Sequence, residues 1–271
     1  MKIVAITATV ALLVPSALHA EGKGVVDTYP SVDSGTGLAF AADEGWIWQT
    51  SYDTNNGETV TVDPATGAFT TRFHVPDVVG VPGTEGKGLC YDEDDQYLYI
   101  TDWMGDSLTT YGDAIYCLDV SNPNSPSLVD VWDFGSLNGI AGIAQRGSHF
   151  YVTYSSGFDI VKYSLHPGGS YTVENTWNVT WGYPGCIHYK ESNDTFYISS
   201  IEGWDIFVTD GANPASLQGC FGPGCLIYGG ITMVDDFYIW ISHPASNENH
   251  VVEDENLSFE SATWGGIKAT P

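Results

Sequence analysis

The sequence predicts an all-β protein, a five-bladed β-propeller of four-stranded antiparallel blades. Two landmarks recur five times in the same order: a glycine that opens a short apolar strand, and an aromatic-rich strand that ends in a hydroxyl side chain. Beyond residues 1–20, no stretch shows sustained helical periodicity, and β-branched and aromatic residues dominate each apolar run. Four-stranded units that repeat every roughly 40 to 55 residues are typical of propeller blades.

The second strand of each unit carries the clearest landmark. It occupies residues 47–50, 98–101, 150–153, 196–199 and 239–242, so that successive copies start 43 to 52 residues apart. The glycine landmark precedes these segments at Gly37, Gly88, Gly142, Gly185 and Gly230. Because two independent landmarks keep their order and spacing, we interpret each pair as the first two strands of one blade.

Polar turns connect the strands within each unit. Acidic and polar residues such as those at 92–95 and 191–194 tolerate left-handed backbone and bond to nearby amides, which suits hairpin turns. A third strand follows, usually with an acid near its start and another at its end, as in Glu58 and Asp63. Since these acids recur by unit, we interpret them as turn hydrogen-bonding groups and not as catalytic groups.

The ring needs a closing strand, and two segments could supply it. Residues 25–29 are predicted to pair with the last unit, whereas residues 257–264 could instead be that unit's own outer strand. The alternative architecture is a six-bladed propeller with one degenerate blade. A β-sandwich would leave the periodicity unexplained.

Residues 1–20 are typical of a secretory signal peptide. Lys2 precedes an apolar run at residues 3–14, and Ala20 is a small residue suited to cleavage. No later stretch approaches the roughly eighteen apolar residues of a membrane span. We therefore expect residues 21–271 to form a single β-propeller domain that is secreted, extracellular or periplasmic, with no membrane insertion.

The chain is strongly acidic. It holds 34 Asp and Glu against 8 Lys and Arg, a formal net charge of -26. Such a charge repels phosphate backbones and anionic lipid surfaces, so nucleic acids are not expected as partners. Cations and neutral molecules remain as possible ligands.

Five cysteines occur, and an odd number leaves at least one thiol unpaired in an oxidising compartment. Cys220 and Cys225 are the closest in sequence and are predicted to form a disulfide. No Cys-x-x-Cys spacing points to zinc.

Three segments carry a family resemblance. The segment Ile115-Tyr116-Cys117-Leu118-Asp119-Val120-Ser121-Asn122-Pro123-Asn124-Ser125-Pro126 resembles the LVIVD repeat of exported bacterial propeller proteins, and residues 207–215 are similar to it in a degraded form. Asp63-Pro64-Ala65-Thr66-Gly67 resembles the YVTN and streptogramin-lyase group of propeller repeats. The resemblance implies an exported propeller and no particular activity, because such repeats occur on adhesins, binding proteins and lyases.

Candidate functional residues follow the second strands of four units. In a propeller these loops share one face with the segments that enter the first strands, and they surround the central channel. Asp53, Asp102, Glu202 and His243 lie in such loops and are the candidate catalytic residues, because paired carboxylates can act as acid and base on a glycosidic bond. Asp53, Asp102 and Glu202 are also the candidate metal ligands for a hard cation such as Ca²⁺; no other cofactor is evident. The competing interpretation is that they are solvated loop residues.

Candidate ligand-binding residues are Trp103, Asp106 and Trp181. The loop at residues 102–113 is the longest on this face, and Trp103 and Trp181 have no counterpart in other units. Tryptophan rings of this kind can stack on a sugar, although packing under a loop explains them equally well.

Three classes of function compete. We favour a binding or scaffold module for a glycan or protein partner, because no known catalytic motif is present. The alternative is a hydrolase or lyase acting on a neutral or cationic saccharide. A purely structural exoprotein is the third class.

Overall fold

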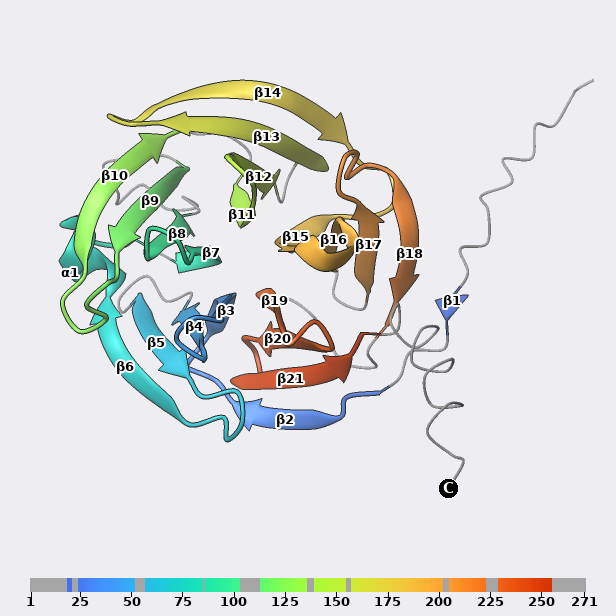
Figure 1. Ribbon diagram of the computed structural model, residues 1–271, viewed down its shortest axis with the longest axis horizontal. Helices are drawn as coiled ribbons and strands as arrows, with labels where there is room; N and C mark the ends of the chain where they lie inside the picture. Colours follow the sequence, from blue (N-terminus) through green and yellow to red (C-terminus); the bar gives the residue numbers. More distant parts are fainter. Residues whose placement is uncertain are drawn as a thin grey trace, which may run out of the picture.

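The protein folds into a ring of five antiparallel sheets around a central channel, as a computed structural model shows (Figure 1). The structure describes residues 19–20, 24–51, 57–84, 86–102, 113–135, 139–154, 157–201, 205–222 and 229–254. The predicted five-bladed propeller is confirmed, and the six-bladed alternative is wrong because the repeating unit occurs five times.

Each of the first four blades is a meander of four consecutive strands, ordered from the channel outward. Blade 1 contains β3 (Gly35–Ala41), β4 (Trp46–Ser51), β5 (Glu58–Val62) and β6 (Phe69–His74). Blade 2 contains β7 (Gly86–Asp92), β8 (Tyr97–Asp102), β9 (Ala114–Asp119) and β10 (Ser127–Asp133). Blade 3 contains β11 (Ile140–Arg146), β12 (His149–Tyr154), β13 (Asp159–His166) and β14 (Ser170–Asn178). Blade 4 contains β15 (Pro184–Lys190), β16 (Thr195–Ser200), β17 (Ile206–Asp210) and β18 (Leu217–Phe221).

Blade 5 takes its outer strand from the other end of the chain. It contains β19 (Ile231–Val234), β20 (Tyr238–His243), β21 (Glu248–Glu253) and β2 (Asp27–Pro30). Asp27 pairs with Val251 and Pro30 with Glu248, so the predicted closure by residues 25–29 is confirmed. The alternative closing segment, residues 257–264, lies outside the described residues.

Three short elements lie outside this repeat. A short strand, β1 (His19–Ala20), pairs in parallel with β18, and it falls within the predicted signal peptide, which stays a prediction. A one-turn helix, α1 (Val75–Val79), joins blades 1 and 2. A 3₁₀ turn, η1 (Glu191–Asn193), links β15 and β16.

The pairing of the first two strands in each blade corrects the position of one landmark glycine. In four blades, the residue that follows the landmark glycine pairs with the third residue of the second-strand landmark. These residues are Leu38, Leu89, Ile143 and Ile231. In blade 4 the equivalent residue is Ile187, which pairs with Ile198. The residue before it is Cys186, so the prediction that Gly185 is the fourth landmark glycine is wrong by one position.

The hydrophobic core is divided into five clusters, one at each interface between neighbouring blades. Trp48, for example, packs with Phe73 of its own blade and with Leu98 of blade 2. Trp240 of blade 5 packs with Ile47 and Val60 of blade 1. Stability is therefore spread around the ring, and each blade depends on both neighbours for the burial of its apolar faces.

Hydroxyl groups at the ends of the second strands tie neighbouring blades together. Ser242 Oγ donates to Thr36 O at 2.7 Å, and Ser199 Oγ donates to Gly229 O at 3.1 Å. Thr153 Oγ1 makes the same bond to Gly185 O. In these three blades the hydroxyl that recurs in the sequence landmark is therefore an interblade hydrogen-bonding group, whereas Thr101 Oγ1 bonds to Gly88 of its own blade.

The acids at the ends of the third strands have the predicted role in turns. Asp63 Oδ1 accepts from Ala65 N at 2.8 Å, Asp119 Oδ1 from Ser121 N at 2.9 Å and Asp210 Oδ1 from Ala212 N at 2.8 Å. The bonds from Thr66 and Ser121 lower the pKa of Asp63 and of Asp119, because they stabilise the ionised form.

Candidate functional site

Asp102 is buried at the end of β8, where it pairs with Gly86 and Ala114. Tyr116 Oη donates a hydrogen bond to its Oδ2 at 3.3 Å. This carboxylate therefore belongs to the packed end of blade 2, and the interpretation as a solvated loop residue is wrong for it.

His243 is also largely buried, at the end of β20. Its Nδ1 accepts from Ser246 N at 3.1 Å and lies 2.6 Å from Ser246 Oγ. Its Nε2 has no hydrogen-bond partner among the described residues. Blade 1 separates the blades that carry Asp102 and His243, and no hydrogen bond joins the two side chains.

The other predicted residues of this face lie mostly outside the described part of the chain: Asp53, Trp103, Asp106 and Glu202. Trp181 is described, and its ring packs on Phe207 with centroids 4.4 Å apart. The indole joins the core cluster between blades 3 and 4. The stacking role of Trp181, like the catalytic and metal roles of the other residues, stays a prediction.

The predicted disulfide also stays a prediction. Cys220 lies in β18, and Cys225 falls outside the described residues. Among the described residues, no group of three or more His, Cys, Asp and Glu is arranged to hold a metal ion.

The channel is narrow at the end where the first strands begin. A Cβ added to Gly88 would lie 2.7 Å from Gly142 Cα, and one added to Gly142 would lie 2.6 Å from Cys186 Cα. Cys186 supplies a side chain where the other four blades have glycine. Its Sγ lies 3.6 Å from Lys87 O and 3.5 Å from Ala141 O, which places the thiol across the axis against blades 2 and 3.

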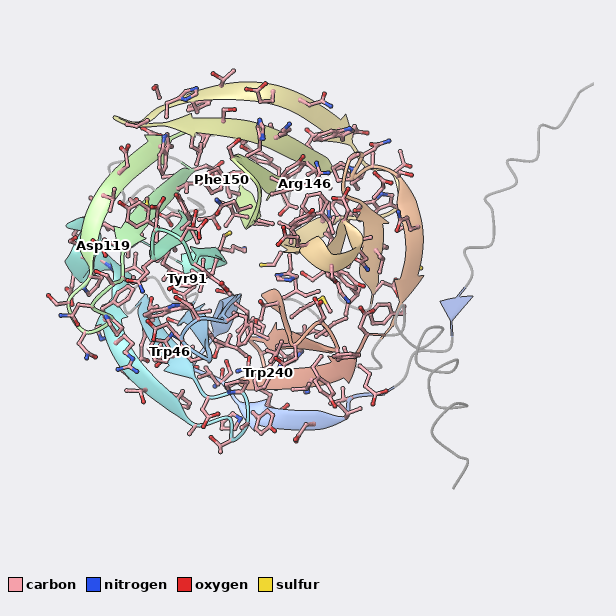
Figure 2. The ribbon with its side chains drawn as sticks, viewed as in Figure 1. Trp46, Tyr91, Asp119, Arg146, Phe150 and Trp240 are labelled. Atoms are coloured by element: carbon pink, nitrogen blue, oxygen red, sulfur yellow. The ribbon has the colours of Figure 1, made fainter. Side chains whose placement is uncertain are left out.

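The opposite end of the channel is open. We call it the hairpin mouth, because the hairpins between first and second strands surround it. It encloses about 950 Å³ and is lined by Phe40, Ala42, Tyr91, Asp92, Glu93, Asp94, Gln145, Gly147, His188, Tyr189, Lys190, Glu191, Ser192, Met233, Asp235 and Asp236. Figure 2 shows Tyr91 beside the central opening.

The hairpin mouth is acidic. Six of its lining residues are Asp or Glu, against the single cation Lys190. The Lys190 ammonium is buried and bonded to Asp254 Oδ2 at 2.8 Å and to Asp236 O at 2.7 Å. The positive charge of Lys190 is thus neutralised locally, and the rim keeps a negative potential that attracts cations.

His188 is the largest side chain at its position among the five inner strands, and it lines the channel. The equivalent inner-strand positions hold Ala39, Cys90, Ala144 and Thr232. Its imidazole makes no hydrogen bond to another described residue. Burial lowers the pKa of His188 to about 4, with a smaller contribution from Lys190 in the same direction and an opposing one from Asp236. The ring is therefore neutral at pH 7 and offers one donor and one acceptor to a ligand.

Neighbouring side chains of the hairpin mouth are fixed by hydrogen bonds. Gln145 Nε2 donates to Asp92 Oδ2 at 2.8 Å, and Tyr91 Oη donates to Asp43 Oδ2 at 3.2 Å. Tyr189 Oη donates to Asp194 Oδ1 at 2.8 Å. The walls of the mouth are therefore preorganised, which reduces the entropy lost on binding.

Sequence reasoning missed this site because it placed the ligand at the loops of the other face. A signal was present: within the repeat, His188 occupies a position that is small in every other blade. Aligning the inner strands residue by residue would have identified it, but only with the register that places Cys186, and not Gly185, at the glycine position.

Comparisons with solved structures agree with the fold. The chain is similar to a glutaminyl cyclase from Myxococcus xanthus, with 13% identity over 87% of this chain and 99% of that one and a TM-score of 0.60. It is similar to a gluconolactonase from Xanthomonas campestris, with 12% identity, 88% and 96% coverage and a TM-score of 0.55. It is similar to a PQQ-bound aldose sugar dehydrogenase from Streptomyces coelicolor, with 13% identity, 84% and 96% coverage and a TM-score of 0.52.

At these identities the likeness shows a shared fold and nothing about activity. No family model and no curated protein matches the chain, so the LVIVD and YVTN resemblance stays a prediction. None of the described helices is long and apolar enough to cross a membrane.

Because His188 is buried in its neutral form, the free energy of unfolding is predicted to depend on pH. The pKa of His188 is about 4 in the folded protein against an ordinary value of 6.5, so the unfolded chain binds the proton more tightly. Stability should be intact above pH 6.5 and should fall by about 3 kcal/mol as the pH drops to 4. The measurement is the free energy of unfolding from pH 4 to 7, for the wild type and for His188→Gln.

In His188→Gln, the loss of unfolding free energy between pH 7 and pH 4 should be smaller than in the wild type by the amount that His188 contributes. The pKa of His250 is also lowered by burial and acts in the same direction, but both proteins retain it. Identical curves would show that His188 is protonated as readily in the folded state as in the unfolded chain.

Proposed function

We propose that the protein is a secreted binding module, and that a glycan or protein partner inserts a positively charged group into the hairpin mouth. The observation that carries the proposal is the neutral, unbonded His188 inside an acidic, preorganised opening of about 950 Å³. The carboxylates would hold an ammonium or guanidinium group, and His188 would bond to a polar atom beside it.

The narrow far end supports binding from one side. Cys186 and the glycine contacts of blades 2 and 3 fill the axis there, so a partner would enter only from the hairpin mouth. The aromatic rings of Tyr91 and Tyr189 could cover the apolar part of the inserted group.

Binding can be measured on immobilised protein with two probes, a chitosan tetramer and a peptide rich in Lys and Arg, and with the neutral chitin tetramer as a comparison. We expect one cationic probe to bind, with an affinity that falls as salt rises. His188→Gln should weaken binding about tenfold and Asp94→Asn about threefold. Asp33→Asn removes an exposed carboxylate that does not line the mouth and should leave the affinity unchanged.

The proposal fails if neither cationic probe binds better than the chitin tetramer, or if His188→Gln and Asp94→Asn both bind like the wild type. The alternative activity, a hydrolase or lyase acting on a neutral or cationic saccharide, would use Asp53, Asp102, Glu202 and His243. Of these, Asp102 is buried against Tyr116, and no observation on the described residues favours catalysis. A Ca²⁺ site at Asp53, Asp102 and Glu202 would show as a calcium-dependent rise in melting temperature.

A further inference from the structure

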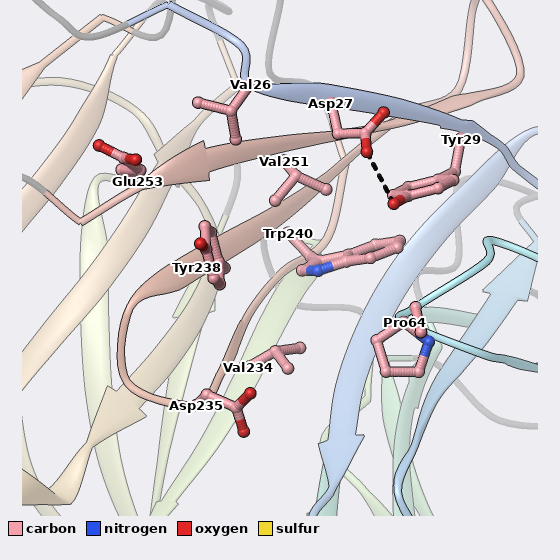
Figure 3. A pocket seen from close by; sticks show the side chains of 11 residues that line it. Val26, Asp27, Tyr29, Pro64, Val234, Asp235, Tyr238, Trp240, Val251 and Glu253 are labelled. Carbon is pink, nitrogen blue, oxygen red and sulfur yellow. Dashed lines mark hydrogen bonds between the residues drawn. The ribbon is translucent and has the colours of Figure 1, made fainter.

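A second cavity lies at the closure of the ring, outside the channel. It encloses about 450 Å³ between blade 5 and the β5–β6 turn of blade 1 (Figure 3). We call it the closure groove; its lining residues are Val26, Asp27, Tyr29, Pro64, Ala65, Val234, Asp235, Tyr238, Trp240, Val251 and Glu253. Only Asp235 also lines the hairpin mouth.

The groove exists because the outer strand of blade 5 is short. The outer strands of the other blades have five to nine residues, whereas β2 has four. Its first residue, Asp27, is opposite Val251, so Val252 and Glu253 of β21 extend beyond it. The side chains of β20 and β21 at this end, including Tyr238, therefore lack the cover that a longer fourth strand would give.

The walls offer an aromatic platform and a donor. Tyr238 is 42% exposed, while Trp240, two residues further along β20, is 2% exposed and is stacked on Tyr29 with ring centroids 5.0 Å apart. Trp240 Nε1 makes no hydrogen bond to a described residue, and Figure 3 shows it on the side of the ring that faces Tyr238. This N–H is not one of the buried polar atoms that lack a partner, so it is open to solvent, and a ligand hydroxyl oxygen can replace water as its acceptor.

The charged side chains of the closure groove indicate the charge of its ligand. Asp27, Asp235 and Glu253 contribute carboxylates, and none of the described lining residues is Lys, Arg or His. A ligand that fits must combine a positive charge with hydroxyl groups and an apolar face that can stack on a tyrosine ring.

We propose that the closure groove binds an amino sugar whose ring stacks on Tyr238, whose ammonium faces the carboxylates, and one of whose hydroxyl oxygens accepts from Trp240 Nε1. The volume is in the range of small-molecule sites. Because the groove is formed by β2, blade 5 and blade 1, a bound sugar contacts both sides of the ring closure and stabilises it by mass action.

The test is a titration with glucosamine and its β-1,4 dimer, with N-acetylglucosamine and glucose as neutral comparisons. We expect the indole N–H resonance of Trp240, assigned with Trp240→Phe, to shift with the amino sugars, and the melting temperature to rise. The neutral sugars should bind at least about tenfold more weakly.

Variants locate the site. Tyr238→Ala should weaken binding about tenfold, whereas Phe237→Ala, which removes the more exposed neighbouring ring at 56% exposure, should change it less than about twofold. His188→Gln should leave this binding intact.

The proposal is overturned by an unmoved Trp240 resonance, by equal affinity for N-acetylglucosamine, or by full affinity in Tyr238→Ala. Loss of glucosamine binding in His188→Gln would assign the sugar to the hairpin mouth, which overturns this site and supports the proposed function.

Discussion

Replacing Lys190 with alanine is expected to lower the free energy of unfolding by about 3–5 kcal/mol. The Lys190 ammonium and the Asp254 carboxylate are 1% and 0% exposed and lie 2.8 Å apart. Tyr197 Oη also donates to Asp254 Oδ2, at 2.7 Å. Without the ammonium, the buried Asp254 carboxylate loses its cationic partner, and the bond from Lys190 to Asp236 O, which links blades 4 and 5, is lost.

The matched control is Arg146→Ala, because Arg146 makes the corresponding link between blades 3 and 4. Its Nε lies 2.8 Å from Asp194 Oδ1, but the two side chains are 31% and 51% exposed. Exposed pairs contribute about 1 kcal/mol or less, so this variant should be far less destabilised. Chemical denaturation of both variants measures the difference.

Combining Lys190→Met with Asp254→Leu should recover part of the stability lost in Lys190→Ala, since a buried ion pair can be replaced by apolar residues of similar size. If Lys190→Ala and Arg146→Ala lose the same free energy of unfolding, burial does not determine how much these two interblade ion pairs stabilise the protein.

The second large effect is expected at Gly142, where valine should destabilise the protein by about 3 kcal/mol or more. The added Cβ would lie 2.6 Å from Cys186 Cα and 2.8 Å from Ile187 N. Both are backbone atoms of the neighbouring inner strand, so relief requires blades 3 and 4 to separate near the axis.

Gly219→Ala is the control for glycine replacement in a strand, because nothing lies within 4 Å of a Cβ added there. Its melting temperature should stay close to that of the wild type, whereas that of Gly142→Val should fall by several degrees. Because the contact involves backbone, removing the thiol in Gly142→Val/Cys186→Gly should not rescue stability. A rescue would show that the side chain of Cys186 causes the strain.

Much of the architecture could be predicted because each blade repeats the same local chemistry. The glycine permits close approach at the axis, the hydroxyl bonds to the next blade in three of the five units, and the acids of the third strand fix turns, so each landmark has a physical cause in the fold. These constraints act within a blade or between neighbouring blades, so the same residue types recur at regular intervals in the sequence.

The candidate sites could not be predicted from this periodicity, because they are formed by residues that differ from the repeat. His188 stands out only against the small residues of the other inner strands, and the closure groove results from a fourth strand that comes from the far end of the chain. Tyr238 and Asp27 are more than two hundred residues apart in sequence. Motif spacing cannot indicate that they line one cavity.

The closing strand also determines how the ring responds to mechanical load. β2 and β21 are antiparallel, and the start of β2 at Asp27 lies beside the end of β21 near Val251. A force that pulls on these two chain ends acts along the interstrand hydrogen bonds and breaks them one after another, beginning with Val26 N to Val251 O. The five blades pack on one another around the ring, yet tension applied at these two chain ends separates the closing pair of strands one hydrogen bond at a time.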